Sequence, residues 1–379
     1  MPVRERLHLL RLAVAFAVLG CSAPAATSAP TAPGAAAGAG TPSATAAHSA
    51  APSAPETAAP SERSTGATHQ PPAPVQLAWR SLLAAGPAAR EDHTWTVDAA
   101  GRTAYLFGGR SGGRAFDDLW RFDLERNTWQ RVASSGERPQ ARFGHTAAWV
   151  DRLGLVVWSG QAASRFFNDL WTFDPATARW RRLPARGALP EPRYGSCAAL
   201  GPDGRLWISH GFTTQGRFGD TKAYDFATAT WRDETPTGGA PVVRCLHDCL
   251  WSSNGRFLLY GGQTNGVAAL GDLWSYRPQE RSWRQERKPE PAPRQLYALA
   301  GFAGRAFVFG GQGLGGEELA DLWLLDLDGL VWTRATPAGA VPRGRAGATL
   351  IADDGRHRLL LFGGRTKEGE LADLWQLGL

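Results

Sequence analysis

The feature that most constrains this chain is a segment of about 50 residues that appears six times. In its clearest copies an apolar run ends in Gly-Gly and is followed by Asp-Leu-Trp, with the glycine pairs at 108–109, 261–262, 310–311 and 363–364. Weaker copies have Ser159-Gly160 and His210-Gly211 in place of the pair. The second glycines fall at positions 109, 160, 211, 262, 311 and 364. A period this regular is typical of a repeat architecture, in which neighbouring units bury one another's apolar faces.

These residues resemble the kelch motif, which continues after Asp-Leu-Trp with the pattern F-D-P-x-T-x-x-W, here residues 173–180. The resemblance covers residues 75–379 and implies an all-β fold, a six-bladed β-propeller with one four-stranded blade per repeat. It implies less about function, because one fold hosts many activities. The repeat also resembles the propeller of galactose oxidase, but the Tyr, Cys and His residues of that enzyme's copper site have no counterpart set here. We therefore expect no cofactor and assign no catalytic residue.

The ends of the repeat region predict how the ring closes. The last repeat reaches Leu379 without the tryptophan that marks a fourth strand, whereas Trp79 stands alone 50 residues before Trp129. We expect the strand around 77–82 to complete the last blade. Pairing these two segments removes a free sheet edge that would otherwise favour aggregation.

The first 74 residues differ in composition from the repeats. Residues 1–20 combine arginines with the apolar run LAVAFAVL, which is typical of a signal peptide and too short to span a membrane as a helix. The following Cys21 completes a pattern that resembles the lipobox of bacterial lipoproteins, and the resemblance implies that Cys21 is lipidated. An ordinary signal peptide is the alternative. Residues 21–74 are rich in Ala, Pro, Ser and Thr and predict a disordered tether. We expect an exported protein that contacts the membrane of the cell envelope through its lipid anchor only.

An arginine opens each first strand and an aspartate opens each third strand. In an up-and-down blade these strands run parallel, so both residues lie at the same end, and an arginine could reach an aspartate of its own or of the next blade. Six arginines matched by six aspartates favour a structural ring, although an anion-binding ring stays open. The residues are Arg90, Arg142, Arg193, Arg244, Arg294 and Arg345 with Asp118, Asp169, Asp220, Asp272, Asp321 and Asp373.

The loops between each glycine pair and the following aspartate vary most, and variable loops on a rigid scaffold often carry binding specificity. Those of blades 1, 2 and 6 carry a group of basic residues, whereas blade 5 carries Glu317 and Glu318. This arc predicts a partner with acidic residues or a carboxylate sugar. Our candidate binding residues are Arg110, Arg114, Arg165, Arg365 and Lys367.

The remaining reactive side chains do not form a metal site in the sequence. His93, His145 and His247 follow the repeat arginine by three residues in blades 1, 2 and 4, which are too far apart to share a metal, and we interpret them as core residues. Among Cys197, Cys245 and Cys249, a disulfide that includes Cys197 and three buried free thiols are both open. The basic residues are not concentrated beside exposed aromatic residues, so we expect no nucleic-acid partner.

The sequence therefore predicts a monomeric, membrane-anchored binding or interaction module whose ligand is an unknown protein or carbohydrate. A periplasmic carbohydrate-modifying enzyme, such as a sialic-acid mutarotase, is the first alternative, and it would need a carboxylate with a nearby His or Arg in the central pocket. A structural envelope protein is the second.

Overall fold

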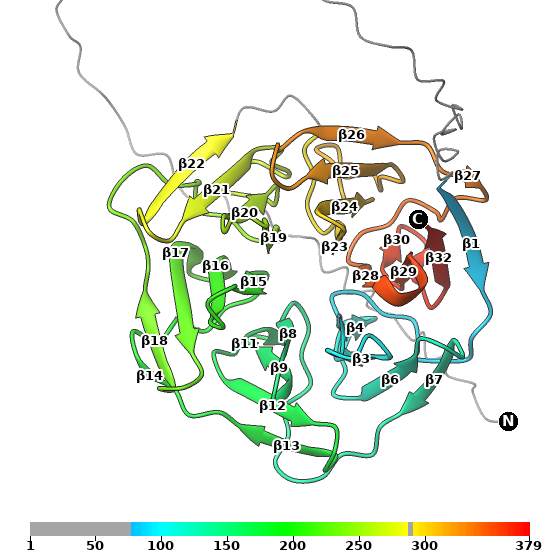
Figure 1. Cartoon of the computed structure of the whole chain (residues 1–379), viewed down its shortest axis with the longest axis horizontal. Helices are drawn as coiled ribbons and strands as arrows, with labels where there is room; N and C mark the ends of the chain where they lie inside the picture. The colour runs from blue at the N-terminus through cyan, green and yellow to red at the C-terminus, as the bar shows by residue number, and fades with distance from the viewer. Residues whose placement is uncertain (1–76, 287–290) are drawn as a thin grey trace, which may run out of the picture. The chain divides into compact units, whose positions relative to one another are not determined.

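The computed structural model describes residues 77–286 and 291–379, which form six radial sheets around a central axis (Figure 1). Each sheet is a blade of four antiparallel strands, which we call the first to the fourth strand, counted from the axis outwards. Blade 1 consists of β2 (Thr94–Val97), β3 (Thr103–Phe107), β6 (Leu119–Asp123) and β7 (Thr128–Arg131). Blade 2 consists of β8 (Thr146–Val150), β9 (Gly154–Trp158), β12 (Leu170–Asp174) and β13 (Arg179–Arg182). Blade 3 consists of β15 (Cys197–Leu200), β16 (Leu206–Thr213), β17 (Gly216–Asp225) and β18 (Thr230–Asp233). Blade 4 consists of β19 (Asp248–Trp251), β20 (Phe257–Tyr260), β21 (Leu273–Arg277) and β22 (Ser282–Glu286). Blade 5 consists of β23 (Ala298–Phe302), β24 (Arg305–Phe309), β25 (Leu322–Asp326) and β26 (Trp332–Ala335). Blade 6 consists of β28 (Thr349–Asp353), β29 (Arg358–Phe362), β32 (Leu374–Gly378) and β1 (Ala78–Leu82).

Short elements decorate this frame. In blades 1, 2 and 6, a hairpin of two-residue strands occupies the loop between the second and the third strand. Strands β14 and β27 extend the outer edges of blades 3 and 6. Within the described ranges the one helical element is a three-residue 3-10 turn, and none is a helix that could cross a membrane. These elements are β4 (Arg110–Ser111), β5 (Arg114–Ala115), β10 (Gln161–Ala162), β11 (Arg165–Phe166), β30 (Arg365–Thr366), β31 (Gly369–Glu370), β14 (Arg186–Gly187), β27 (Ala338–Gly339) and η1 (Asp354–Arg356).

The predicted closure of the ring is confirmed. Strand β1 pairs antiparallel with β32, with Trp79 opposite Leu377, and so supplies the fourth strand of blade 6. The Trp79 side chain is buried and its ring lies 5.3 Å from that of Phe309 in blade 5. The two ends of the repeat region thus share one sheet.

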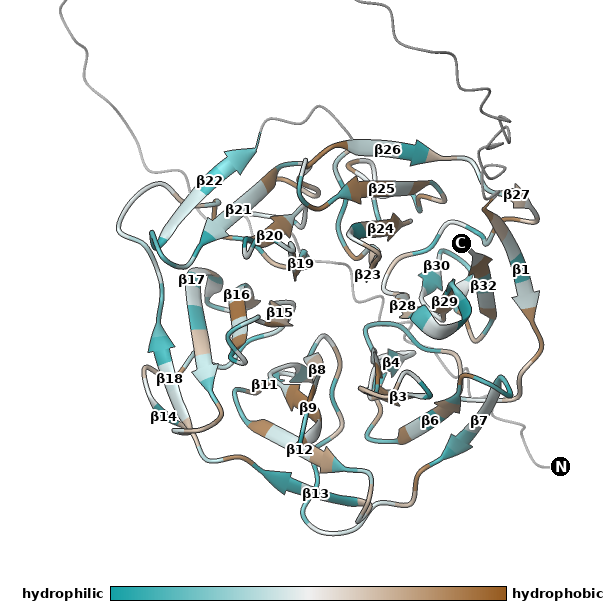
Figure 2. Ribbon diagram, in the orientation of Figure 1, coloured by the Kyte–Doolittle hydropathy of each residue, from teal (hydrophilic) through white to brown (hydrophobic). Residues whose placement is uncertain are grey.

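The core lies between blades. Six clusters of buried apolar residues each join two neighbouring blades, as where Phe362 of blade 6 packs against Trp95 and Trp129 of blade 1. Second strands such as β9 and β29 are buried along their whole length, because another blade covers each of their faces. Outer strands such as β13 and β18 carry exposed charged residues and appear hydrophilic in Figure 2.

Local turn chemistry explains the Phe-Asp-Pro motif between third and fourth strands. Asp174 Oδ1 accepts the backbone N–H of Ala176 at 2.9 Å, and Thr177 Oγ1 donates to Asp174 Oδ2 at 2.7 Å. Ala178 then adopts a φ of 52°. An aspartate that bonds the backbone two residues ahead is a common way to fix such a turn.

Two closed circles of backbone hydrogen bonds join the blades near the axis. In the inner circle the second residue after each repeat arginine donates its N–H to the equivalent carbonyl of the preceding blade, over distances of 2.8–3.1 Å. In the outer circle the second glycine of each pair donates to the carbonyl of the next blade's arginine. A side chain at these glycines would collide; a Cβ on Gly109 would lie 2.8 Å from the Glu91 carbonyl oxygen. The inner circle consists of Asp92, Gly144, Gly195, Leu246, Leu296 and Gly347.

Candidate functional site

Each repeat arginine binds the aspartate of its own blade, not of the next. In blade 2, Arg142 Nη1 and Nη2 lie 2.7 and 3.0 Å from Asp169 Oδ1 and Oδ2, and the Trp171 indole donates to Asp169 Oδ2 at 2.7 Å. We call this arrangement a latch, and the end of the propeller that carries it the latch face. The tryptophan bond recurs in five blades; in blade 3 Lys222 replaces the tryptophan. The six latches are Arg90–Asp118, Arg142–Asp169, Arg193–Asp220, Arg244–Asp272, Arg294–Asp321 and Arg345–Asp373.

The latch arginines are not available to an anionic ligand. Arg142 also donates to the carbonyls of Ser159 and Gln140, so four of its five N–H groups are used, and its side chain is fully buried. The other five arginines repeat these contacts. Burial alone would raise the pKa of Asp169, but the hydrogen bonds and charge of Arg142 outweigh it and the pKa is lowered. The geometry is that of a structural ring.

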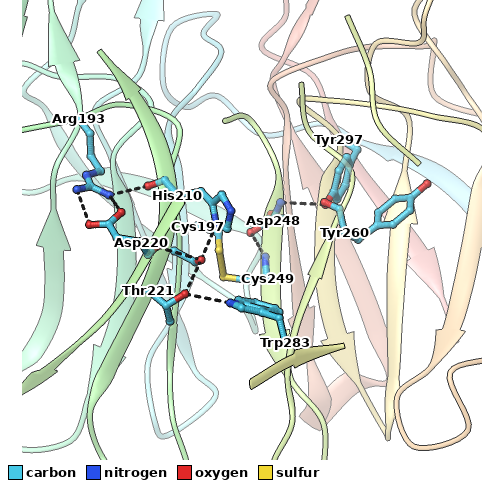
Figure 3. The surroundings of a disulfide bond; sticks show 11 residues. Arg193, Cys197, His210, Asp220, Thr221, Asp248, Cys249, Tyr260, Trp283 and Tyr297 are labelled. Carbon is cyan, nitrogen blue, oxygen red and sulfur yellow. Dashed lines mark hydrogen bonds and ion pairs between the residues drawn. A yellow bond between two sulfur atoms is a disulfide. The ribbon is translucent and has the colours of Figure 1, made fainter. Parts of the chain in front are cut away.

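A disulfide joins blades 3 and 4. Cys197 of β15 and Cys249 of β19 are bonded, with their Cα atoms 5.6 Å apart (Figure 3). Cys245 is a buried free thiol, and burial raises its pKa. Of the two states that the sequence left open, the structure has the disulfide that includes Cys197.

The first strands of all six blades surround a central cavity of about 260 Å³. The inner backbone circle lines it at the latch face, and Trp95, Ala198, Leu299 and Leu350 supply apolar wall. Neither arginine nor lysine is among its lining residues. The cavity can hold a small polar molecule, but it offers no cationic side chain to a carboxylate.

Asp248, the first residue of β19, places a carboxyl group on the wall of this cavity. Its Oδ1 accepts the N–H of Cys249 at 3.0 Å, and its own N–H donates to the Tyr297 hydroxyl at 2.9 Å (Figure 3). Burial raises the pKa of Asp248 to about 7. Our sequence reasoning missed this residue although a signal existed, because the equivalent residues of the other blades are all uncharged: Thr94, Thr146, Cys197, Ala298 and Thr349.

The histidines that follow the latch arginines are core residues. His93 packs edge-on against Phe362, and His145 packs against Phe107 while its Nε2 lies 2.9 Å from Thr94 Oγ1. Burial lowers the pKa of His93 to about 3, with a further contribution from the Arg90 charge, so the ring is neutral near pH 7. Across the residues that the structure describes, no group of three or more His, Cys, Asp or Glu side chains could hold a metal ion.

A second charged group lies where blades 1 and 6 meet. Glu91 is bound by Arg110 at 3.1 Å and by Arg365 at 2.7 Å, and Arg110 also contacts Asp92 at 3.1 Å. Burial, reinforced by the Asp92 charge, raises the pKa of Glu91 to about 7 against the opposing effect of the two arginines. We call Glu91, Asp92, Arg110 and Arg365 the blade 1–6 ion cluster.

The five candidate binding residues therefore separate into two sets. Arg110 of β4 and Arg365 of β30 are brought together on Glu91 and are partly buried. Arg114, Arg165 and Lys367 are exposed on the latch-face hairpins, and none of them forms an ion pair with a residue in 77–286 or 291–379. Arg165 instead donates to Gln140 at 3.2 Å and lies over the Phe167 ring.

Comparison with known proteins agrees with this geometry. The family model described as the KLHDC2/KLHL20/DRC7 Kelch-repeats domain matches residues 74–262 and 234–379, which together span every blade. The chain belongs to this kelch-repeat family.

Individual relatives of this kelch propeller are eukaryotic. Kelch domain-containing protein 10 of Xenopus tropicalis is 28% identical over 229 residues, covering 56% of this chain and 54% of the relative. Kelch domain-containing protein 3 of Homo sapiens is 28% identical over 252 residues, covering 60% and 63%. Adagio protein 3 of Arabidopsis thaliana is 30% identical over 227 residues, covering 55% and 35%. The matches thus span less than two thirds of each of these relatives.

Proposed function

We propose that this protein is an exported, membrane-anchored kelch module that binds a partner through its latch face. The observation that carries this proposal is the position of the exposed large apolar side chains in the described residues. Seven of the eight lie in loops of the latch face, between second and third strands or between successive blades, and only Val331 lies in a loop at the opposite end. Interaction sites are marked by exposed apolar patches and not by single apolar side chains, so the shared face of these residues, and not their number, supports the proposal. The seven are Leu83, Leu189, Val242, Val243, Val267, Leu314 and Val341.

The charge of this face favours an acidic partner, either a protein or a carboxylate-bearing carbohydrate. Arg114, Arg165 and Lys367 are the exposed cations of the candidate set, whereas Arg110 and Arg365 are already paired with Glu91 and Asp92. Exposed charges act mainly on encounter and are screened beyond about 8–10 Å at physiological salt. Binding should therefore weaken as salt rises.

A charge reversal tests the face. The triple variant Arg114→Glu, Arg165→Glu, Lys367→Glu should retain its melting temperature and lose the partner that the wild type retains from envelope extract. The matched control reverses the same number of charges at the opposite end of the propeller, with Arg102→Glu, Arg152→Glu and Arg305→Glu, all exposed. Equal retention of the partner by the two triple variants would refute a latch-face site.

The anchor and the compartment belong to the same proposal. Cys21 lies outside the described residues, and the support from the structure is indirect. The Cys197–Cys249 disulfide suits an oxidising compartment, as an exported protein would meet. Replacing Cys21 by Ala should release the protein from the membrane fraction or stall its processing. A Cys21→Ala protein that matures and fractionates like the wild type would exclude the lipid anchor.

The central cavity meets part of the requirement of the carbohydrate-modifying alternative, because Asp248 and the three histidines His93, His145 and His247 line it together, but it does not favour an acidic sugar. An enzyme acting on a carboxylate sugar needs a cation to bind the carboxylate, and the cavity is lined by the Asp248 carboxyl without any arginine or lysine.

A further inference from the structure

We propose that the central cavity binds a small organic cation, with Asp248 as its counter-charge. This site lies on the axis, inside the ring of loops that carry Arg114, Arg165 and Lys367, and it does not depend on the proposed function.

The first argument is that Asp248 is a carboxyl group without a positively charged partner among the described residues. It lines the cavity and accepts one backbone N–H, and it forms no ion pair with any residue in the described part of the chain. Asp248 is half-buried in the cavity wall, and a charge withdrawn from water in this way is costly unless it is paired. The other carboxylate on the cavity wall, Asp92, is already paired with Arg110 at 3.1 Å.

The second argument is that the surrounding imidazoles cannot supply the missing charge. His93, His145 and His247 line the cavity, and burial lowers the pKa of each, with that of His93 at about 3. They are neutral near pH 7. The described residues therefore supply no cation to Asp248, and we assign that role to an external molecule.

A further unsatisfied group lines the same space. Ser196 is 7% exposed, and its Oγ has no hydrogen-bond partner among the residues described. Thr94, Thr146 and Thr349 add hydroxyl groups to the wall, and Leu299 and Leu350 add apolar surface. Hydroxyl oxygens can accept ammonium protons, while the apolar wall suits an alkyl group.

The donor set argues against a divalent metal ion. Calcium takes roughly 6–8 oxygen ligands, and magnesium demands near-octahedral oxygen coordination. The described residues contain no cluster of three or more metal-binding side chains, and Asp248 is the single uncompensated carboxyl group of the cavity. One carboxylate among hydroxyl and apolar groups fits a monovalent alkylammonium.

The proposal is tested by calorimetry on the full-length protein with two probes of equal size, n-butylammonium chloride and n-butanol. The cation should bind and the neutral alcohol should bind far more weakly. Asp248→Asn keeps the acceptor for Cys249 and should weaken n-butylammonium at least about 30-fold, the lower end for loss of one partner of a buried charge pair. The matched control Asp151→Asn removes an exposed carboxylate and should bind like the wild type.

The wild type alone provides a test that does not depend on the variant's folding. The titratable groups packed around Asp248 are His247 on its own blade and Tyr297 and Tyr260 of blades 5 and 4, and burial lowers the pKa of the first and raises those of the tyrosines. Among these groups, Asp248 alone titrates near neutrality. With a pKa of about 7, its ionised fraction falls about tenfold between about pH 8 and about pH 6, while an alkylammonium stays protonated as lysine does. Affinity should fall by the same factor.

Three results would overturn the proposal. They are equal affinity for n-butanol and n-butylammonium, an unchanged affinity in a folded Asp248→Asn variant, and the absence of any binding of n-butylammonium by the wild type at about pH 8.

Discussion

At the residue scale, the latch explains why Asp-Leu-Trp recurs. The aspartate accepts two bonds from the arginine and one from the indole two residues later, and the leucine between them is buried, as Leu170 is in blade 2. The sequence predicted the arginines and aspartates because they repeat six times. It left their pairing open, because spacing along the chain does not show which strand a long side chain reaches.

Breaking one latch should therefore be costly. Arg142→Met leaves Asp169, only 16% exposed, without its counter-charge. Removal of one partner of a buried pair costs about 3–5 kcal/mol. Urea unfolding should show this loss of stability, and the double variant Arg142→Met, Asp169→Leu should recover part of it. A loss below about 1 kcal/mol, which is typical of a surface ion pair, would show that the latch is not a buried contact.

The latches also predict the direction of the acid response. The pKa values of Asp118, Asp169, Asp272, Asp321 and Asp373 are lowered, because the arginine contacts outweigh the opposing effect of burial. Their stabilising contribution is therefore complete above the unfolded value of about 4 and is lost as pH falls through the folded values. Unfolding free energies measured across this range should fall with pH, and less steeply for Asp169→Asn. An equal slope in variant and wild type would contradict the assignment.

At the element scale, two contacts tie together parts of the chain that are distant in sequence. Strand β1 completes blade 6, and the Cys197–Cys249 disulfide links β15 of blade 3 to β19 of blade 4. The first was predictable, because an unmatched tryptophan reveals a missing strand. The second was not fixed, because spacing gives the reach of a cysteine but not its partner.

Loss of β1 should open the ring. A protein that begins at Ala84 lacks Trp79 and leaves β32 with an unpaired edge, so it should aggregate or unfold without cooperativity. A protein that begins at Pro74 should melt like the full chain. Identical melting curves for the two would exclude a structural role for β1.

Reduction of the Cys197–Cys249 disulfide should lower the stability of the propeller. The cysteines are 52 residues apart, and the chain-entropy relation gives about 4 kcal/mol for a loop of that size. Dithiothreitol should lower the melting temperature of the wild type and of Cys245→Ala. It should leave the doubly substituted Cys197→Ala, Cys249→Ala protein unchanged. A response to reductant in that double variant would show that another thiol is responsible.

At the scale of the whole molecule, prediction succeeded where the six repeats agree and failed where they differ. Averaging over repeats reveals the blades, the latches and the glycine pairs, since these occur at equivalent positions. It hides Asp248 and Glu91, which occupy positions where the other blades are uncharged. Their environment depends on neighbours from other blades, such as Tyr297 and Arg365. The residues that carry the proposed cation site and the blade 1–6 ion cluster are therefore exceptions to the repeat.

The closure of blade 6 sets an order of events during biosynthesis. Trp79 and Leu377 are paired although they are 298 positions apart, counted from 79 to 377. At roughly 5–20 residues per second, the ribosome adds the second about 15–60 s after the first. During that interval β1 lacks its antiparallel partner β32, and blade 6 cannot be completed. The ring of a nascent chain therefore stays open until β32 emerges, although blades 1 to 5 each consist of strands that are already complete.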